Sequence, residues 1–346
     1  MRIDLTHDEK VEVFGIVKAW KRKQITQDRL RSIQKETGIP ARSIDIMFWH
    51  YDSLSLFENV DGFTFKGGTC VQSWLPGRYQ RASVDLDFNS MVGNPNSIQD
   101  IIEDINRISI GNGRTTEIRG INFGSIEFKY TDDQTGTMTF IRRMPTRFDE
   151  VIRVDGDSIQ GIEQRIQINF KNAWLPSVKP VRSEPDFVIL KYEKPQFKAE
   201  VIHSSIEDLI ADKILATCNV HGFGRERFKD VYDLGMILDL KRDNELIMRK
   251  LSLIAQKKGV DPQSFIEGSV ETISRISDRS QEAIGFASMV GKGGRERIIS
   301  SWEMFCLDVI EQIRSINTNI NRKVLNRKME KVEEATKDQL LDIDDL

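Results

Sequence analysis

The segment Ser83-Val-Asp-Leu-Asp-Phe88 constrains the fold of this chain more than any other part of it. It has the composition of a short strand that follows a turn. Because side chains two apart in a strand point to the same face, Asp85 and Asp87 project together while Leu86 faces the other way. Two carboxylates placed like this repel each other and make a poor core. The pair is therefore either solvated at a strand end or held by something that offsets its charge.

A divalent cation between the two carboxylates would offset that charge. Magnesium prefers oxygen ligands and usually takes one or two carboxylates together with the phosphates of a substrate. Two such ions about 3.5–4 Å apart stabilise both oxygens of a phosphoryl displacement. Asp85 and Asp87 are therefore predicted to bind Mg²⁺. The alternative is an ordinary strand end with solvated acids, because short motifs match by chance.

A glycine pair before the acids supports the metal interpretation. Gly67 and Gly68 lie between a predicted strand at 63–65 and a short predicted helix, and Gly68 precedes Asp85 by 17 residues (85 − 68). Glycines let the backbone approach a phosphate, and the start of a helix offers free N–H groups to it. Thr69 adds a hydroxyl and Lys66 a cation. The combination predicts a phosphate site beside the acids.

A lysine on an apolar helical face marks a second cluster. Ser205 to Asp208 forms a capping box that predicts a helix start, and on that helix Lys213 shares one face with apolar neighbours: Ile206, Leu209 and Ile210. One interpretation directs the Lys213 amine into a cleft, toward a phosphate. The other packs its stem on apolar neighbours and lets the amine reach water.

Asp230 occupies a similar position on the next predicted helix. It lies on a face that is otherwise mostly apolar and follows 4-3-4-3 spacing: Phe223, Arg227, Leu234 and Ile237. It is either catalytic or a structural partner of Arg227 or Lys213. The connection through 221–224 is short, so the two helices are expected to be antiparallel neighbours. Lys213 and Asp230 would then share one polar pocket.

The order of patterns predicts an α+β protein. A helical N-terminal cap over 1–60 precedes a mixed α/β core over 61–203, a helical C-terminal part over 204–320 and a charged tail over 321–346. The net charge of −3 leaves the partner open. Three scattered cysteines, no secretory segment at the N-terminus and no long apolar run indicate a cytoplasmic protein without a membrane span.

Four blocks of sequence, in this order, resemble the AbiEii/AbiGii toxin family of nucleotidyltransferases, which includes the toxins of AbiE-type and MenT-type toxin–antitoxin pairs. The resemblance spans roughly 61–240 and is weak before residue 50 and after about 245. The blocks are Lys66-Gly-Gly-Thr69, Arg81-Ala-Ser-Val-Asp-Leu-Asp-Phe88, Asp208-Leu-Ile-Ala-Asp-Lys213 and Arg227-Phe-Lys-Asp230-Val-Tyr-Asp-Leu234.

The resemblance implies a DNA polymerase β-like nucleotidyltransferase core and a magnesium-dependent enzyme. It implies an NTP substrate, an acceptor hydroxyl on RNA, tRNA in some members, and a cognate antitoxin. Asp85 and Asp87 would bind the metal, and Lys213 and Asp230 would complete the catalytic site. The nucleotide would be bound by residues of the first three blocks: Lys66, Gly67, Gly68, Thr69, Arg81, Ser83 and Asp208.

One departure from the family concerns a third acid, which a later core strand often carries. The corresponding stretch here is Arg165-Ile-Gln-Ile-Asn169, so Gln167 stands in its place. An amide is a weaker base and metal ligand than a carboxylate. Asp230 or Glu163 would have to compensate, or activity is reduced.

Two further functions compete with RNA modification. The same fold can act as a kinase-like phosphotransferase or modify a protein hydroxyl, and a chain lacking the third acid can bind nucleotide or a partner without transfer. A basic run suits a nucleic-acid backbone but also fits a solvated loop: Arg142, Arg143, Arg147 and Arg153.

Overall fold

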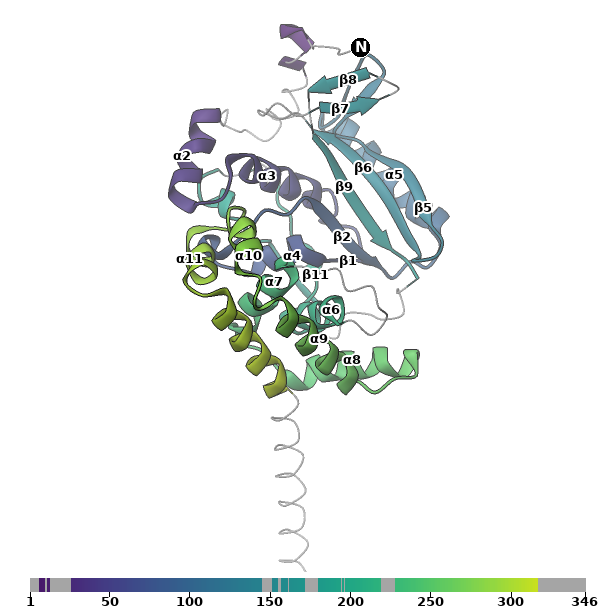
Figure 1. The fold of residues 1–346 in the computed structure, drawn as a ribbon. Helices are drawn as coiled ribbons and strands as arrows, with labels where there is room; N and C mark the ends of the chain where they lie inside the picture. The colour runs from purple at the N-terminus through teal and green to yellow at the C-terminus, as the bar shows by residue number, and fades with distance from the viewer. Residues whose placement is uncertain are drawn as a thin grey trace, which may run out of the picture.

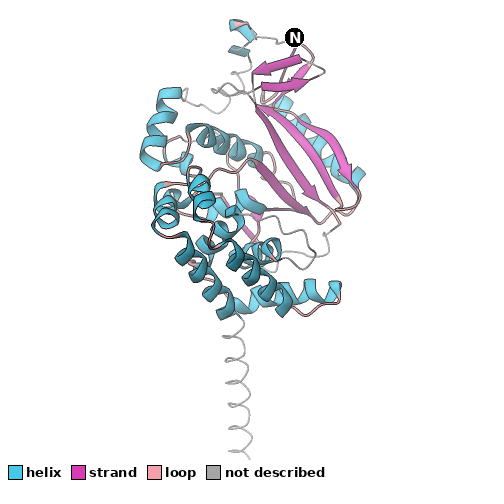
Figure 2. Cartoon of the chain, viewed as in Figure 1, coloured by secondary structure: helices cyan, strands magenta, loops and turns pink. Residues whose placement is uncertain are grey.

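A mixed sheet of seven strands, in the order β10-β11-β1-β2-β9-β6-β5, forms the centre of the computed structural model. The structure describes residues 6–9, 11–12, 26–144, 151–154, 157–160, 162–171, 180–193, 195, 197–218 and 228–316, with the backbone alone for 151–154 and 157–160. Figure 1 shows α5 behind β5 and β6, and the C-terminal helices gathered at the end of the sheet that holds β1 and β11. Figure 2 shows the same separation of helices and strands. The α+β architecture is confirmed.

The sheet strands pair both parallel and antiparallel. β1 lies antiparallel to β2 and parallel to β11, β2 lies parallel to β9, and the remaining neighbours are antiparallel. The seven strands are β1 (Phe63–Lys66), β2 (Asp85–Ser90), β5 (Ile126–Asp132), β6 (Thr137–Met144), β9 (Ile162–Asn169), β10 (Val181–Ser183) and β11 (Val201–His203). Two hairpins stand apart from this sheet: β3 (Thr116–Ile118) with β4 (Ile121–Phe123), and β7 (Val151–Val154) with β8 (Asp157–Gln160).

Strand β2 has one apolar and one polar face, as its sequence predicts. Leu86 and Phe88 are buried, and the Phe88 ring stacks on Phe57 with centroids 4.6 Å apart. The intervening Asp85 and Asp87 are only half-buried. Burying the apolar side against the core leaves both acids on the opposite, open face.

Hydroxyl side chains cap the starts of two helices, and the cap at Ser205 was predicted. Thr26 accepts from the backbone N–H of Arg29 at the start of α2, and Ser205 accepts from that of Asp208 at the start of α6. The helices described between residues 26 and 300 are α2 (Gln27–Thr37), α3 (Ala41–Ser55), α4 (Gly67–Trp74), α5 (Pro95–Gly111), α6 (Ile206–Thr217), α7 (Phe228–Leu238), α8 (Asn244–Lys258), α9 (Gln263–Ile276), α10 (Ser280–Ala287) and α11 (Lys292–Ser300). A further helix covers 302–316.

The last part of the region predicted to be helical, 204–320, contains two helices, because the extended backbone of Ser301 (φ −169°) separates α11 from 302–316. Most of the first 25 residues of the predicted N-terminal cap, the connection at 221–224, Arg227 and the charged tail at 321–346 lie outside the described residues. No described helix has both the length and the apolar character needed to cross a membrane.

The predicted nucleic-acid role of the arginine run is wrong for its first two members. Arg142 is fully buried, with Nη1 2.5 Å from Asp52 Oδ2, and Arg114 pairs with the same carboxylate. Arg143 is largely buried and pairs with Glu127. A buried guanidinium must be neutralised, so these side chains hold strands to α3 and to each other instead of facing a ligand. Arg147 and the side chain of Arg153 lie outside the described residues.

A buried histidine links α3 to the segment that leads into β2. His50 Nε2 lies 3.0 Å from the Ser83 carbonyl oxygen, and its Nδ1 lies 2.8 Å from Nε2 of Gln164. Since the amide of Gln164 can only donate to Nδ1, the ring proton is on Nε2. Burial lowers the pKa of His50 to about 4, against the opposite effect of the Ser83 carbonyl.

Because of this low pKa, the folded state loses stability as the pH falls. Between pH 6.5 and 4, His50 is protonated in the unfolded chain but stays neutral in the folded chain. Acidification therefore favours unfolding. From pH 7 to pH 5 the free energy of unfolding should fall by roughly 2 kcal/mol through this residue. Urea unfolding of the wild type and of His50→Gln at both pH values measures it. The variant should not show this part of the fall in the free energy of unfolding between the two pH values. An equal fall in the wild type and the variant would contradict the low pKa of His50.

Candidate active site

A tight glycine turn faces the acids of β2. Gly67, which opens α4, has φ +79°, a conformation that disfavours any side chain. A Cβ atom built there would lie 2.1 Å from Asp87 Oδ2. Lys66, just before the turn, is the register partner of Asp87 across the β1–β2 ladder. The turn therefore brings a cation and the start of a helix directly against the Asp87 carboxylate.

Gly67→Ala should destabilise the protein by roughly 2 kcal/mol or more, because a left-handed backbone and a close contact add their costs. Gly111→Ala, at the last residue of α5, is a matched control. A Cβ atom there meets nothing within 4 Å, so its effect should be neutral or slightly stabilising. Thermal or chemical unfolding compares the two variants. Equal effects would mean that Gly67 and Asp87 are not in close contact.

The carboxylates of Asp85 and Asp87 experience different environments. Burial raises the pKa of Asp87, and repulsion from Asp85 adds to this while Lys66 opposes it. An ionised Asp87 is therefore costly without a nearby cation. This is the electrostatic situation expected of a cation-binding pair, because the bound charge removes the repulsion.

Thr69 supports the acids from behind. It is buried, and its hydroxyl lies 2.6 Å from the Asp85 carbonyl oxygen and 2.8 Å from Ser83 Oγ. The hydroxyl thus ties α4 to the beginning of β2. Thr69 does not line the cavity described below, whereas Ser83 does.

A buried charge cluster forms the opposite wall. Lys213 Nζ lies 2.6 Å from Asp230 Oδ1 and 2.8 Å from Asp233 Oδ2. Arg81 binds the same Asp233 with both Nε (2.7 Å) and Nη2 (2.6 Å). The prediction that Lys213 and Asp230 share one polar pocket is confirmed. The cluster contains two cations and two anions, so their charges balance.

The ion pairs outweigh burial in this cluster. Burial alone would lower the pKa of Lys213, but Asp233 and Asp230 raise it above its ordinary value. Burial would raise the pKa of Asp233, but Arg81 and Lys213 hold it below its ordinary value. Lys213 and Asp233 are therefore charged at neutral pH.

A cavity of about 450 Å³ lies between the glycine turn, the acids and this charge cluster. It joins residues that are more than 100 positions apart in the chain. Its lining is Lys66, Gly67, Gly68, Arg81, Ser83, Asp85, Asp87, Leu209, Asp212, Lys213, Leu215, Ala216, Lys229 and Asp230. The structure thus places nine of the eleven predicted site residues, including both acids, around one opening.

Asp208 is the second predicted nucleotide-binding residue that lies elsewhere. It is fully buried, and Lys250 Nζ lies 3.0 Å from its Oδ1. Lys250 also lies 3.0 Å from Asp212, which lines the cavity. Asp208 therefore anchors α6 to α8 and acts on the cavity only through the position of that helix.

Sequence reasoning missed three residues of the site: Asp212, Lys229 and Asp233. Asp233 accepts hydrogen bonds from Gln72 Nε2 (3.1 Å) and from Arg81, and it pairs with Lys213. It therefore connects α4, the segment that leads into β2, and α6. The available signal was its position three residues after Asp230, on the same face of the helix.

Gln167 lies beside the two acids, as the resemblance of its strand to the family's third-acid strand implies. It is the register partner of Asp87 in the parallel β2–β9 ladder. Among the described residues no group of three or more His, Cys, Asp or Glu side chains is arranged to hold a metal ion. Two carboxylates still suit Mg²⁺, provided that substrate phosphates and water complete its octahedron.

The open acid pair, the glycine turn and the facing lysine define a nucleotidyltransferase. Residues 51–304 match the family model described as nucleotidyl transferase AbiEii toxin, type IV TA system, and the chain belongs to this AbiEii family. A crystal structure of a proposed nucleotidyltransferase from H. pylori is similar to the chain, with a TM-score of 0.40 and 15% identity. That similarity covers 79% of this chain and 96% of the H. pylori chain. None of the curated proteins matches.

Proposed function

We propose that this chain is a magnesium-dependent toxin that transfers a nucleoside monophosphate from an NTP to a hydroxyl of RNA, with tRNA as the acceptor. The observation that supports it best is the single cavity that joins Asp85 and Asp87 to the Gly67–Gly68 turn and to Lys213. Carboxylates and phosphate-binding groups face each other there, as a nucleotide–metal complex requires.

Each wall of the cavity has its own part in binding the triphosphate. The backbone N–H groups at the start of α4, exposed by Gly67 and Gly68, face phosphate oxygens, and Lys66 adds a positive charge. Lys213 and Lys229 supply positive charge from the opposite wall. Asp230 and Asp233 hold the Lys213 amine in place.

Asp85 and Asp87 would hold Mg²⁺, which when bound offsets the negative charge of the phosphates. The acceptor hydroxyl oxygen forms a bond to the α-phosphorus while the bond from that phosphorus to the bridging oxygen breaks. Pyrophosphate leaves with the electron pair, and the hydroxyl proton passes to water. The chain contributes position and charge in this step and forms no covalent bond to the substrate.

The choice of acceptor rests on chemistry, since a tRNA offers a free ribose hydroxyl at its end. The family description supports the choice of partner. A cognate antitoxin is expected to neutralise the protein, as the family's toxin–antitoxin description indicates. The three cysteines are free thiols, which fits a reducing cytoplasm.

Transfer can be tested with NTPs labelled at the α-phosphate or, in parallel reactions, at the γ-phosphate, together with the protein, magnesium and either total RNA or purified tRNA. The α-phosphate label should enter RNA from at least one NTP, and this incorporation should disappear with EDTA. Label on a protein instead, or transfer from the γ-phosphate alone, would show a protein-modifying enzyme or a phosphotransferase.

Nucleotide binding without transfer is a second candidate, because a neutral Gln167 stands beside Asp87 where a third acid is expected. In that case calorimetry should detect NTP binding while every transfer assay stays blank.

A further inference from the structure

The polar face of the sheet continues well beyond the two acids. One row of side chains crosses five strands at the level of Asp87, each member being the register partner of the next. In order across the sheet the row is Lys66, Asp87, Gln167, Thr139 and Tyr130. A second row runs beside it and consists of Asn89, Asn169, Thr137 and Asp132.

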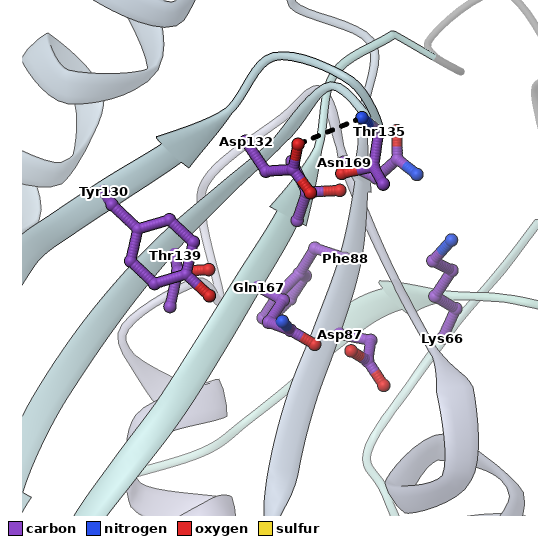
Figure 3. Close-up of a pocket in the computed structure, with 10 residues that line it drawn as sticks. Lys66, Asp87, Phe88, Tyr130, Asp132, Thr135, Thr139, Gln167 and Asn169 are labelled. Atoms are coloured by element: carbon purple, nitrogen blue, oxygen red, sulfur yellow. Dashed lines mark hydrogen bonds between the residues drawn. The ribbon is translucent and has the colours of Figure 1, made fainter.

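These two rows, apart from Asn89, line a groove of about 330 Å³. The groove is separate from the cavity around the glycine turn and shares with it Lys66 and Asp87. Figure 3 shows Tyr130 over Thr139 at one end of the groove, with Gln167 between them and Asp87. The lining is Lys66, Asp87, Phe88, Tyr130, Asp132, Thr135, Thr137, Thr139, Gln167 and Asn169.

The groove differs from the cavity in charge. Away from Lys66 and Asp87, the described lining has one charged group, Asp132, which accepts from the backbone N–H groups of Gln134 (2.9 Å) and Thr135 (3.3 Å) and so stabilises the turn between β5 and β6. Among the described residues that line the groove, only Lys66, at the shared end, is a cation. Amides and hydroxyls therefore dominate the groove, which suits an uncharged hydrogen-bonding ligand and not a phosphate.

Two side chains of the first row favour such a ligand. The Thr139 hydroxyl oxygen is buried and has no hydrogen-bond partner among the described residues. A buried hydroxyl without a partner is costly, so a ligand that supplies one is favoured. Tyr130 is 46% exposed and offers an aromatic ring at the far end.

The geometry points to a nucleoside, a ribose with its base, as the occupant of this groove. Tyr130 would stack on the base, and Thr139 and Gln167 would hydrogen-bond to base edges or ribose hydroxyls. Three strand spacings of about 4.8 Å separate Tyr130 from Asp87, so one nucleoside can reach from the ring to the reacting phosphate. This inference rests on the proposed function.

The nucleoside belongs either to the donor NTP or to the end of the acceptor, and binding measurements separate the two. Calorimetry with the full chain uses tripolyphosphate, each of the four NTPs and a single-stranded RNA trinucleotide. Tyr130→Ala should weaken the binding of the NTP or of the trinucleotide by roughly 5- to 150-fold, the usual loss of affinity when one base–aromatic stack is removed. Tripolyphosphate should bind unchanged. Loss for the NTP assigns the groove to the donor, and loss for the trinucleotide assigns it to the acceptor.

Two further variants keep this test specific. Tyr130→Phe should retain binding, because the ring is kept. Phe128→Ala removes a ring of similar exposure (48%) from the same strand, but this ring contacts Phe140, which is on the other face of β6 from Thr139, so binding should not change. No loss with Tyr130→Ala, or an equal loss for tripolyphosphate, would overturn the groove assignment. Failure of the proposed function has another signature: normal binding by the wild type with no nucleotide transfer.

Discussion

Asp87→Asn is expected to lower nucleotide transfer by about three orders of magnitude, since a metal ligand contributes several kcal/mol to phosphoryl transfer. The fold should survive. Burial and Asp85 raise the pKa of Asp87, so its ionised form destabilises the folded state above that pKa. A neutral asparagine removes this cost, and the variant should be at least as stable as the wild type at pH 7 without metal.

Initial rates of α-phosphate transfer and urea unfolding without magnesium measure the two effects. Asp104→Asn is a suitable control, because Asp104 is an exposed acid on α5 that pairs with Arg107. It should change neither quantity appreciably. Full activity of Asp87→Asn with unchanged magnesium dependence would place the metal site elsewhere.

The second large effect concerns stability and arises at Asp233. Asp233→Asn should destabilise the protein by roughly 3–5 kcal/mol, because it leaves Arg81 and Lys213 buried with only Asp230 as a counter-charge. The folded pKa of Asp233 lies below its ordinary value, so its contribution is present at neutral pH and is lost as the pH falls through that folded pKa. The difference between wild type and variant should therefore shrink in acid.

Urea unfolding at pH 7 and at low pH tests this, with Asp239→Asn as the control. Asp239 follows α7 and pairs with Arg297 at the surface, where both side chains are at least one-third exposed. Such a pair contributes at most about 1 kcal/mol. Similar losses for the two variants would show that Asp233 does not hold the cluster together.

The sequence alone predicted the local parts of the site. The two acids on one strand face follow from the period of two, the glycine turn from a Gly-Gly pair between a predicted strand and a predicted helix, and the inward Lys213 and Asp230 from helical periodicity. Each of these signals lies within a few neighbouring residues. For the same reason the cap of α6 was predicted correctly.

Only the tertiary structure decided which charges meet. Arg142 forms a buried ion pair with Asp52, and Asp208 forms one with Lys250. Asp233 pairs with both Arg81 and Lys213. Likewise, Tyr130, Thr139 and Gln167 form one row only because three strands pair in one register. A charge or a strand has many possible partners far away in the chain. Folding chooses among them by burying the set whose charges and hydrogen bonds are satisfied together.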